Sequence, residues 1–157
     1  LWPPIAQVVL ILAAFAGGCA GSTAGGIKMI RVLTIWRQGA REIKRLVHPN
    51  GVFHVKVGGR PVGEPVLNSI WSFISVYIFL FFFSIILIMT VSKLDFLTSF
   101  SAVSASLNNL GPGLGMVGES YEDISAPVKW ILIVNMMLGR LELFTILVLF
   151  TPYYWRR

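Results

Sequence analysis

Long apolar stretches alternate with short polar ones along this chain, and their lengths predict which helices cross a membrane. Residues 66–92 form a continuous aromatic-rich run, long enough as a helix to cross a hydrocarbon core of about 30 Å. Residues 128–152 predict another span. Between these runs, residues 95–107 would reach only about 20 Å as a helix, which is too short to cross.

A further apolar segment is interrupted near its middle. Residues 5–16 are apolar, a glycine-rich run occupies residues 17–26, and residues 27–36 are again helical in pattern although they carry Lys28. Five of the ten residues in the run are glycine, and each glycine destabilises a helix interior by up to about 1 kcal/mol. The sequence therefore predicts a broken span within residues 1–50, whose far end continues as a polar helix.

Three interpretations of the glycine-rich run compete. Gly17, Gly21 and Gly25 have the spacing of tandem GxxxG motifs, which in an apolar helix mark a close helix–helix crossing. A phosphate-binding loop needs a lysine directly after its last glycine, and here Ile27 comes first. The third interpretation is an unwound segment that closes a pore from below. The residues of such a gate would be Gly17, Gly18, Gly21, Ser22, Thr23, Gly25 and Gly26.

The run Asn108–Gly115 lies between two apolar stretches but has too much glycine and proline for a helix or a strand. Irregular backbone at membrane depth is tolerated only where it is buried in protein or lines a water-filled cavity. Its carbonyl groups are then free to hold a cation. The run therefore predicts a stretch of backbone that lines a pore.

Composition predicts that the chain lies in a membrane, and the distribution of charge predicts which segments face the cytoplasm. The chain is 55% hydrophobic and 13% charged, whereas globular domains average about 25% charged residues. Residues 28–60 carry eight Lys or Arg against Glu42 alone, while residues 93–129 carry two Lys against four acidic residues. The positive-inside rule makes the basic stretch and the C-terminus cytoplasmic. The helix at 95–107 must then be re-entrant, with Asp95 able to cap its first N–H groups.

The basic stretch contains two further candidate features. Arg37, Arg41, Lys44 and Arg45 fall on roughly one face of a helix, where they would meet either anionic lipid head groups or a cytoplasmic partner. Residues 51–65 predict a small hairpin, because apolar positions alternate before a Gly-Gly turn.

Arg140 is the charged residue that the pattern places deepest in a predicted span. An arginine at the centre of a membrane helix costs about 2.5–3.5 kcal/mol on insertion scales, so it normally faces a cavity or a partner. Glu142 lies only two positions away and projects to a different face, which disfavours an intrahelical pair. A pore barrier, a tether for the glycine-rich run and a structural ion pair all remain open.

Four runs of residues closely resemble the membrane subunit of bacterial Trk-type potassium uptake systems, part of the superfamily that includes Trk, Ktr and HKT transporters. They are residues 17–28, 45–50, 108–115 and 138–142. The resemblance implies an all-α integral membrane fold of helix–pore loop–helix repeats of the potassium-channel type. We expect a C-terminal piece, because the chain starts at Leu1 without methionine, that holds the second helix of the third repeat and all of the fourth.

The resemblance also implies site residues. The fourth repeat's part of the K⁺ filter would be Asn109, Leu110, Gly111, Pro112 and Gly113. Backbone carbonyls of Asn109, Leu110 and Gly111 would ligate K⁺. The glycine-rich run would be the gate, and Arg140 would hold it closed. Pro112 replaces an aromatic residue found in potassium channels, which predicts looser selectivity.

The function that the resemblance implies is K⁺ transport across a bacterial inner membrane. The expected partners are a cytoplasmic nucleotide-binding regulatory ring and a second copy in a homodimer, with nucleotide bound only through the ring. We expect no enzyme activity, no cofactor of the chain's own and no nucleic acid partner. Two other classes stay open: a secondary transporter with a broken-helix substrate site, and a purely structural membrane subunit.

Overall fold

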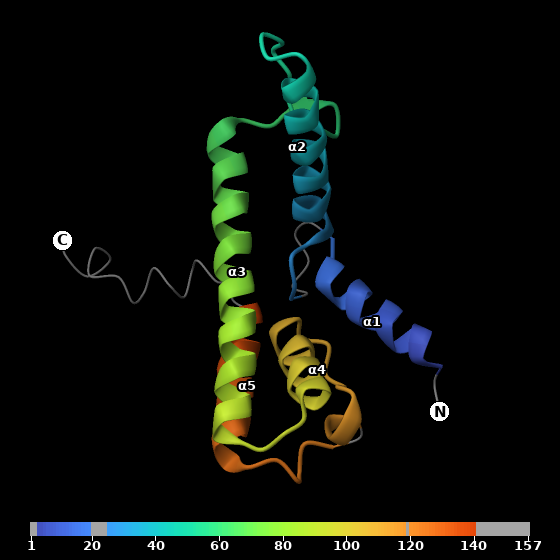
Figure 1. Ribbon diagram of the computed structural model, residues 1–157, viewed down its shortest axis with the longest axis vertical. Coiled ribbons are helices and arrows are strands. Elements are labelled where there is room, and N and C mark those ends of the chain that lie inside the picture. Colours follow the sequence, from blue (N-terminus) through green and yellow to red (C-terminus); the bar gives the residue numbers. More distant parts are fainter. Residues whose placement is uncertain (1–2, 20–24, 119, 141–157) are drawn as a thin grey trace, which may run out of the picture.

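A computed structural model describes residues 3–19, 25–118 and 120–140 of the 157-residue chain. The elements are almost entirely helical (Figure 1). In chain order they are α1 (Pro4–Ala16), α2 (Met29–Val47), β1 (Lys56–Val57), β2 (Arg60–Pro61), α3 (Glu64–Val91), α4 (Phe96–Leu107), the 3₁₀ turn η1 (Gly115–Val117) and α5 (Ala126–Arg140).

Helix α3 is the axis on which the other elements are arranged. Helix α2 lies beside its N-terminal half, while α4 and α5 lie beside its C-terminal half (Figure 1). Helix α4 also contacts α1, α5 and η1. Nine of the twelve residues of α4 are buried, so this short helix is the centre of the packed core.

The span expected at 66–92 is confirmed as a helix, with two more residues at its start. Helix α3 has 28 residues and is about 42 Å long at 1.5 Å per residue. Among the described residues it is the one helix long and apolar enough to cross a membrane. The predicted span 128–152 is helical as far as Arg140, where the described part ends.

The helix break is also confirmed. Helix α1 ends at Gly17, whose φ of +67° favours glycine, and the Gly17 N–H bonds the carbonyls of Ala13 and Ala14. After the glycine-rich run the chain lies beside the end of α1, because the Ile27 N–H donates to the Phe15 carbonyl at 3.3 Å. The described glycines of the run lie outside any helix, so the tandem GxxxG interpretation is wrong: consecutive GxxxG motifs need one continuous helix.

The short helix expected at 95–107 is confirmed as α4, but the predicted cap is wrong. Asp95 occupies the N-cap position, yet its side chain makes no capping hydrogen bond. The residue is exposed, so water can solvate its carboxylate instead. The Asp95 carbonyl accepts the first helical bond from the Ser99 N–H at 3.0 Å.

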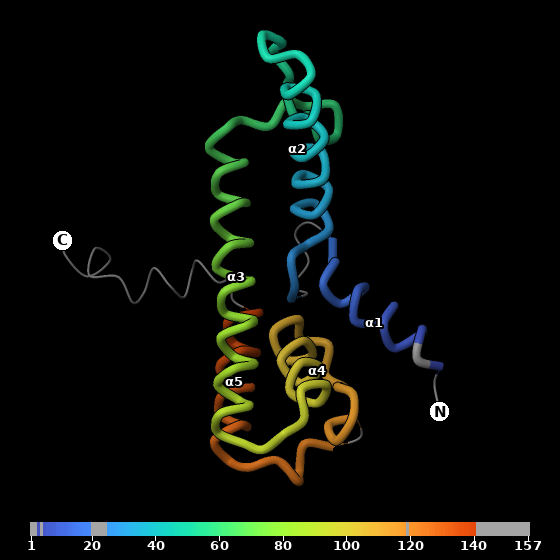
Figure 2. Tube along the Cα trace, viewed as in Figure 1, coloured from blue at the N-terminus to red at the C-terminus, as the bar shows by residue number. Residues whose placement is uncertain are grey.

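The chain around α4 doubles back on itself. Helix α4 starts at the C-terminal end of α3 and runs back along it (Figure 2). The following irregular segment returns to the same end of α3, where α5 begins. The loop thus enters and leaves at one end of the long helix.

The small hairpin at the other end of α3 is confirmed. Strands β1 and β2 are antiparallel, with Val57 opposite Arg60. Gly58 and Gly59 form the turn with φ values of +59° and +78°, the left-handed pair that a two-residue hairpin prefers. The Val62 N–H extends the pairing by donating to the Val55 carbonyl at 2.8 Å.

Candidate filter and gate

The candidate filter begins where α4 ends. The amide of Asn109 still bonds the carbonyl of Ser106, and the amide of Leu110 bonds that of Ala105 at 2.8 Å. Asn109 has φ +55°, which asparagine tolerates better than most residues. Gly111 follows with φ +103°, a conformation that side-chain-bearing residues rarely adopt, although no atom lies within 4 Å of where a Cβ would be. Glycine is therefore required at position 111 by backbone geometry rather than by space.

Hydrogen bonds hold residues 113–114 of this loop against α4 and η1. The Ser101 hydroxyl lies 2.9 Å from the Leu114 nitrogen and 3.0 Å from the Leu114 oxygen. The Gly113 N–H donates to the Val117 carbonyl at 3.2 Å, which ties the loop to η1. A Cβ at Gly115 would lie 2.6 Å from the Thr98 hydroxyl, so glycine permits close approach there.

The carbonyl groups of the loop differ in the hydrogen bonds that they accept from the described residues. The Tyr121 hydroxyl donates to the Gly111 carbonyl at 2.9 Å. A tyrosine hydroxyl is protonated at neutral pH and can act as this donor. Within the described part of the chain, no residue donates a hydrogen bond to the carbonyls of Asn109, Leu110 or Pro112.

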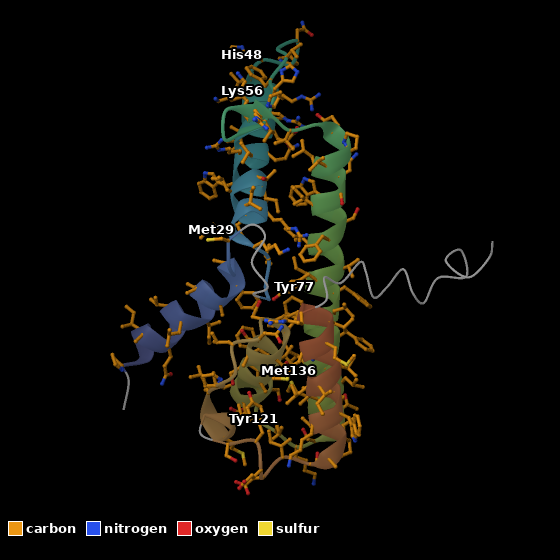
Figure 3. The ribbon with its side chains drawn as sticks, turned by 180° about the vertical axis from the view of Figure 1, so that it is seen from behind. Met29, His48, Lys56, Tyr77, Tyr121 and Met136 are labelled. Atoms are coloured by element: carbon orange, nitrogen blue, oxygen red, sulfur yellow. The ribbon has the colours of Figure 1, made fainter. Side chains whose placement is uncertain are left out.

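A buried polar pair lies behind the start of the loop. The Tyr77 hydroxyl of α3 donates to Asn108 Oδ1 at 2.8 Å, and Asn108 Nδ2 donates to the Ser104 carbonyl at 2.9 Å. Both side chains are buried. Figure 3 shows Tyr77 at the level where the helix break meets the end of α4. The pair fixes α3 to the point where α4 turns into the loop.

The described end of the glycine-rich run packs against this same point. A Cβ at Gly25 would lie 2.7 Å from the Asn108 carbonyl oxygen and 2.8 Å from Asn109 Nδ2. A Cβ at Gly26 would lie 3.0 Å from both the Ala14 carbonyl and Asn108 Oδ1. The structure thus brings Gly25 and Gly26 of the candidate gate together with the candidate filter. Gly17 and Gly18 lie at the helix break, and Gly21, Ser22 and Thr23 fall outside the described residues.

Helix α5 packs against the end of α4 and the start of the loop at Gly139. A Cβ there would lie only 2.0 Å from the Leu107 carbonyl oxygen and 2.9 Å from Asn109 Nδ2. The next residue, Arg140, is exposed, and no hydrogen bond or ion pair joins it to the described part of the glycine-rich run. Glu142 lies outside the described residues.

The four basic residues of α2 that were expected on one face differ in their burial. Arg41 is buried and pairs with Glu64 at 2.6 Å and Glu42 at 3.1 Å. The hydrogen bond to Glu64 raises the pKa of Arg41. The expectation that Arg41 meets lipid head groups or a cytoplasmic partner is therefore wrong, because the side chain is buried in ion pairs within the chain. Arg37, Lys44 and Arg45 remain exposed.

The family profile described as TrkH, cation transport protein, matches residues 1–157. This chain belongs to the TrkH family. It is 51% identical over 155 residues to the Trk system potassium uptake protein TrkH of Escherichia coli K12, covering 99% of this chain and 32% of that protein. It is 42% identical over 156 residues to TrkG of the same strain, with the same coverage.

A solved structure supports the same assignment. The crystal structure of the potassium transporter TrkH from Vibrio parahaemolyticus matches with a TM-score of 0.89 and 49% identity, covering 99% of this chain and 33% of that one. The chain thus spans about a third of the length of its TrkH-family relatives. The relatives are transport proteins, which agrees with the expected non-enzyme class and makes this a membrane protein.

Sequence reasoning missed several residues of this site. Tyr77, Ser101, Asn108, Tyr121 and Gly139 all hold the loop, and none was singled out for that role. Tyr77 carried a usable signal, because a tyrosine inside an apolar phenylalanine-rich run needs a partner for its hydroxyl. Gly139 carried one too, since a glycine in a membrane helix often marks a close crossing.

Proposed function

We propose that this chain forms one sector of a K⁺-conducting pore and so takes part in potassium uptake across a bacterial inner membrane. The observation that carries the proposal is the path of the segment between α3 and α5, which runs inward as α4, turns at Asn109–Gly111 and returns to the same end of α3 (Figure 2). The relatives named as potassium uptake proteins support the choice of ion. Since those proteins are about three times as long, the remaining sectors would come from other repeats.

The filter would act through backbone oxygens. A dehydrated cation needs oxygen ligands to replace its water shell, and carbonyls supply them without a net charge. The carbonyls of Asn109 and Leu110, which accept no hydrogen bond from the described residues, are suited to this role. The Gly111 carbonyl keeps one lone pair available while the Tyr121 hydroxyl occupies the other. The C-terminal end of α4 adds its negative dipole end at the same point.

Metal-site side chains are not needed for this chemistry. Among the described residues, no group of three or more His, Cys, Asp or Glu side chains gathers in a way that could hold a metal ion. K⁺ is the transported substrate in this proposal, and the backbone holds it only in passing. Binding through neutral carbonyls is weak enough to let the ion leave again.

The glycine-rich run would be the gate beneath the filter. Its support is the close packing of Gly25 and Gly26 on Asn108 and Asn109, the residues at which α4 turns into the loop. Glycine allows this approach and lets the run change conformation. Arg140 would stabilise the closed position by bonding freed carbonyls of the run.

The assembly follows the same proposal. The basic end of the molecule, with α2 and the hairpin, would face the cytoplasm, as would the C-terminus. A nucleotide-binding regulatory ring would dock there, and the membrane subunit would pair with a second copy. The printed name "Trk system" of the relatives agrees with a multi-subunit assembly.

The test is K⁺-limited growth of an uptake-deficient bacterium that carries the complete gene. We expect rescue by the unchanged protein, loss of rescue or of K⁺ preference with Gly111→Ser, and rescue with Gly118→Ser. Gly118 is the matched control, because it lies in the same loop but has an ordinary φ of −70°. If the complete protein reaches the membrane and does not rescue, the potassium assignment is wrong, and a secondary transporter for another substrate becomes the better explanation.

A further inference from the structure

The hairpin and helix α2 line a cavity that is open to the surface and lies outside the candidate filter and gate. The cavity has a volume of about 410 Å³. Three basic residues that line it, Arg37, Arg41 and Lys44, come from α2. The opposite wall includes His54, just before β1, and Lys56, the first residue of β1. None of its lining residues is acidic.

One of these cations is already neutralised. Arg41 forms its ion pairs with Glu64 and Glu42, and Arg45 shares the Glu42 carboxylate at 3.6 Å. These pairs join α2 to Glu64, the first residue of α3, and they engage both Glu42 and Glu64. Arg41 is therefore a structural wall rather than a ligand.

Arg37, Lys44 and Lys56 have no acidic partner among the described residues. Arg37 spends one guanidinium N–H on the Lys56 backbone carbonyl, which holds its side chain across the gap to the hairpin. Within the described residues, no carboxylate forms an ion pair with the ammonium group of Lys44 or Lys56. Like charges around one cavity repel each other, so an anion bound between them would relieve that repulsion.

We infer that this cavity binds a phosphate group, held by Arg37, Lys44 and Lys56. A guanidinium fork and two ammonium groups form short, charge-assisted hydrogen bonds with phosphate oxygens. Two sources of phosphate fit: an anionic lipid head group or a small soluble phosphate. The exposed apolar side chains of Trp36, Ile43 and Leu46 on the same helix give α2 the composition of a helix at a membrane surface.

The inference does not depend on K⁺ transport, since binding is measured without any ion flux. The complete protein in neutral detergent is titrated with inorganic phosphate by calorimetry. The same protein in phosphatidylcholine nanodiscs with and without phosphatidylglycerol is examined by native mass spectrometry for retained lipid. A saturable phosphate signal would identify the soluble source, and retained phosphatidylglycerol alone would identify the lipid source; either supports the site.

Three variants make the test specific. The double variant Lys44→Gln/Lys56→Gln removes two ligands, and we expect about tenfold weaker binding or loss of the retained lipid. Arg60→Gln is the matched control, because it removes one charge from the same hairpin but does not line the cavity. The variant Lys44→Arg should still bind phosphate or lipid. That result would show that the double variant loses binding through its lost charges and not through misfolding. Equal binding by the double variant and the control, or no binding of either probe, would overturn the inference and leave an ordinary solvated basic face.

Discussion

Replacing Gly139 with alanine tests whether α5 supports the candidate filter. The added Cβ would lie 2.0 Å from the Leu107 carbonyl oxygen, whereas real Cβ contacts essentially never fall below 3.0 Å. Either α5 or the end of α4 must therefore move by at least about 1 Å. Overpacking of this kind typically costs about 1–3 kcal/mol.

The displaced carbonyl lies two residues before Asn109, so the movement would pass directly into the loop. We expect Gly139→Ala in the complete protein to melt at a lower temperature in detergent and to take up K⁺ more slowly in proteoliposomes at equal protein density. The matched control is Gly39→Ala in α2, where a Cβ meets nothing within 4 Å. That change should be neutral or stabilise the helix by about 0.5–1 kcal/mol.

Two results would refute this reasoning. If Gly139→Ala melts and transports like the unchanged protein, α5 does not press on the end of α4. If Gly39→Ala loses as much stability and uptake as Gly139→Ala, the effect is a general response to alanine in these helices and not a contact with Leu107.

Three further substitutions have distinct expected results. Tyr121→Phe removes the 2.9 Å bond to the Gly111 carbonyl, so K⁺ over Na⁺ preference should fall in flux assays while melting changes little; unchanged preference would remove Tyr121 from the filter. Tyr77→Phe leaves Asn108 Oδ1 without its buried donor, so melting should show a loss of about 1–3 kcal/mol, and an unshifted melting curve would argue against the bond. Arg140→Ala should raise basal K⁺ flux, and equal or lower flux at equal expression would exclude a gate role.

The helices and the break could be predicted from sequence because each depends on local properties. The length of an apolar run fixes whether a helix such as Glu64–Val91 can cross a membrane. The glycines clustered between residues 17 and 26 each lower helix stability by up to about 1 kcal/mol, and together they favour a break, whereas the single glycines Gly39 and Gly139 are tolerated inside α2 and α5. The Gly58-Gly59 turn follows equally from local backbone preference.

The contacts that hold the site could not be predicted, because they join residues far apart in the chain. Tyr77 and Asn108 are 31 positions apart, and the pairing depends on how α3 and α4 pack. Arg41 looked like a lipid-facing residue until the fold placed Glu64 beside it, 23 positions away. Asp95 had the right residue type and position for a cap, but solvent competes for an exposed carboxylate.

The central claim is that the backbone at Gly111 selects a cation. The most direct measurement is the K⁺ to Na⁺ flux ratio of the complete protein in proteoliposomes, compared among the unchanged protein, Gly111→Ser and Gly118→Ser. A side chain at φ +103° costs about 1–3 kcal/mol and should force the Gly111 peptide to turn, so we predict a lower ratio for that variant and an unchanged ratio for Gly118→Ser. An unchanged ratio with Gly111→Ser would contradict the account.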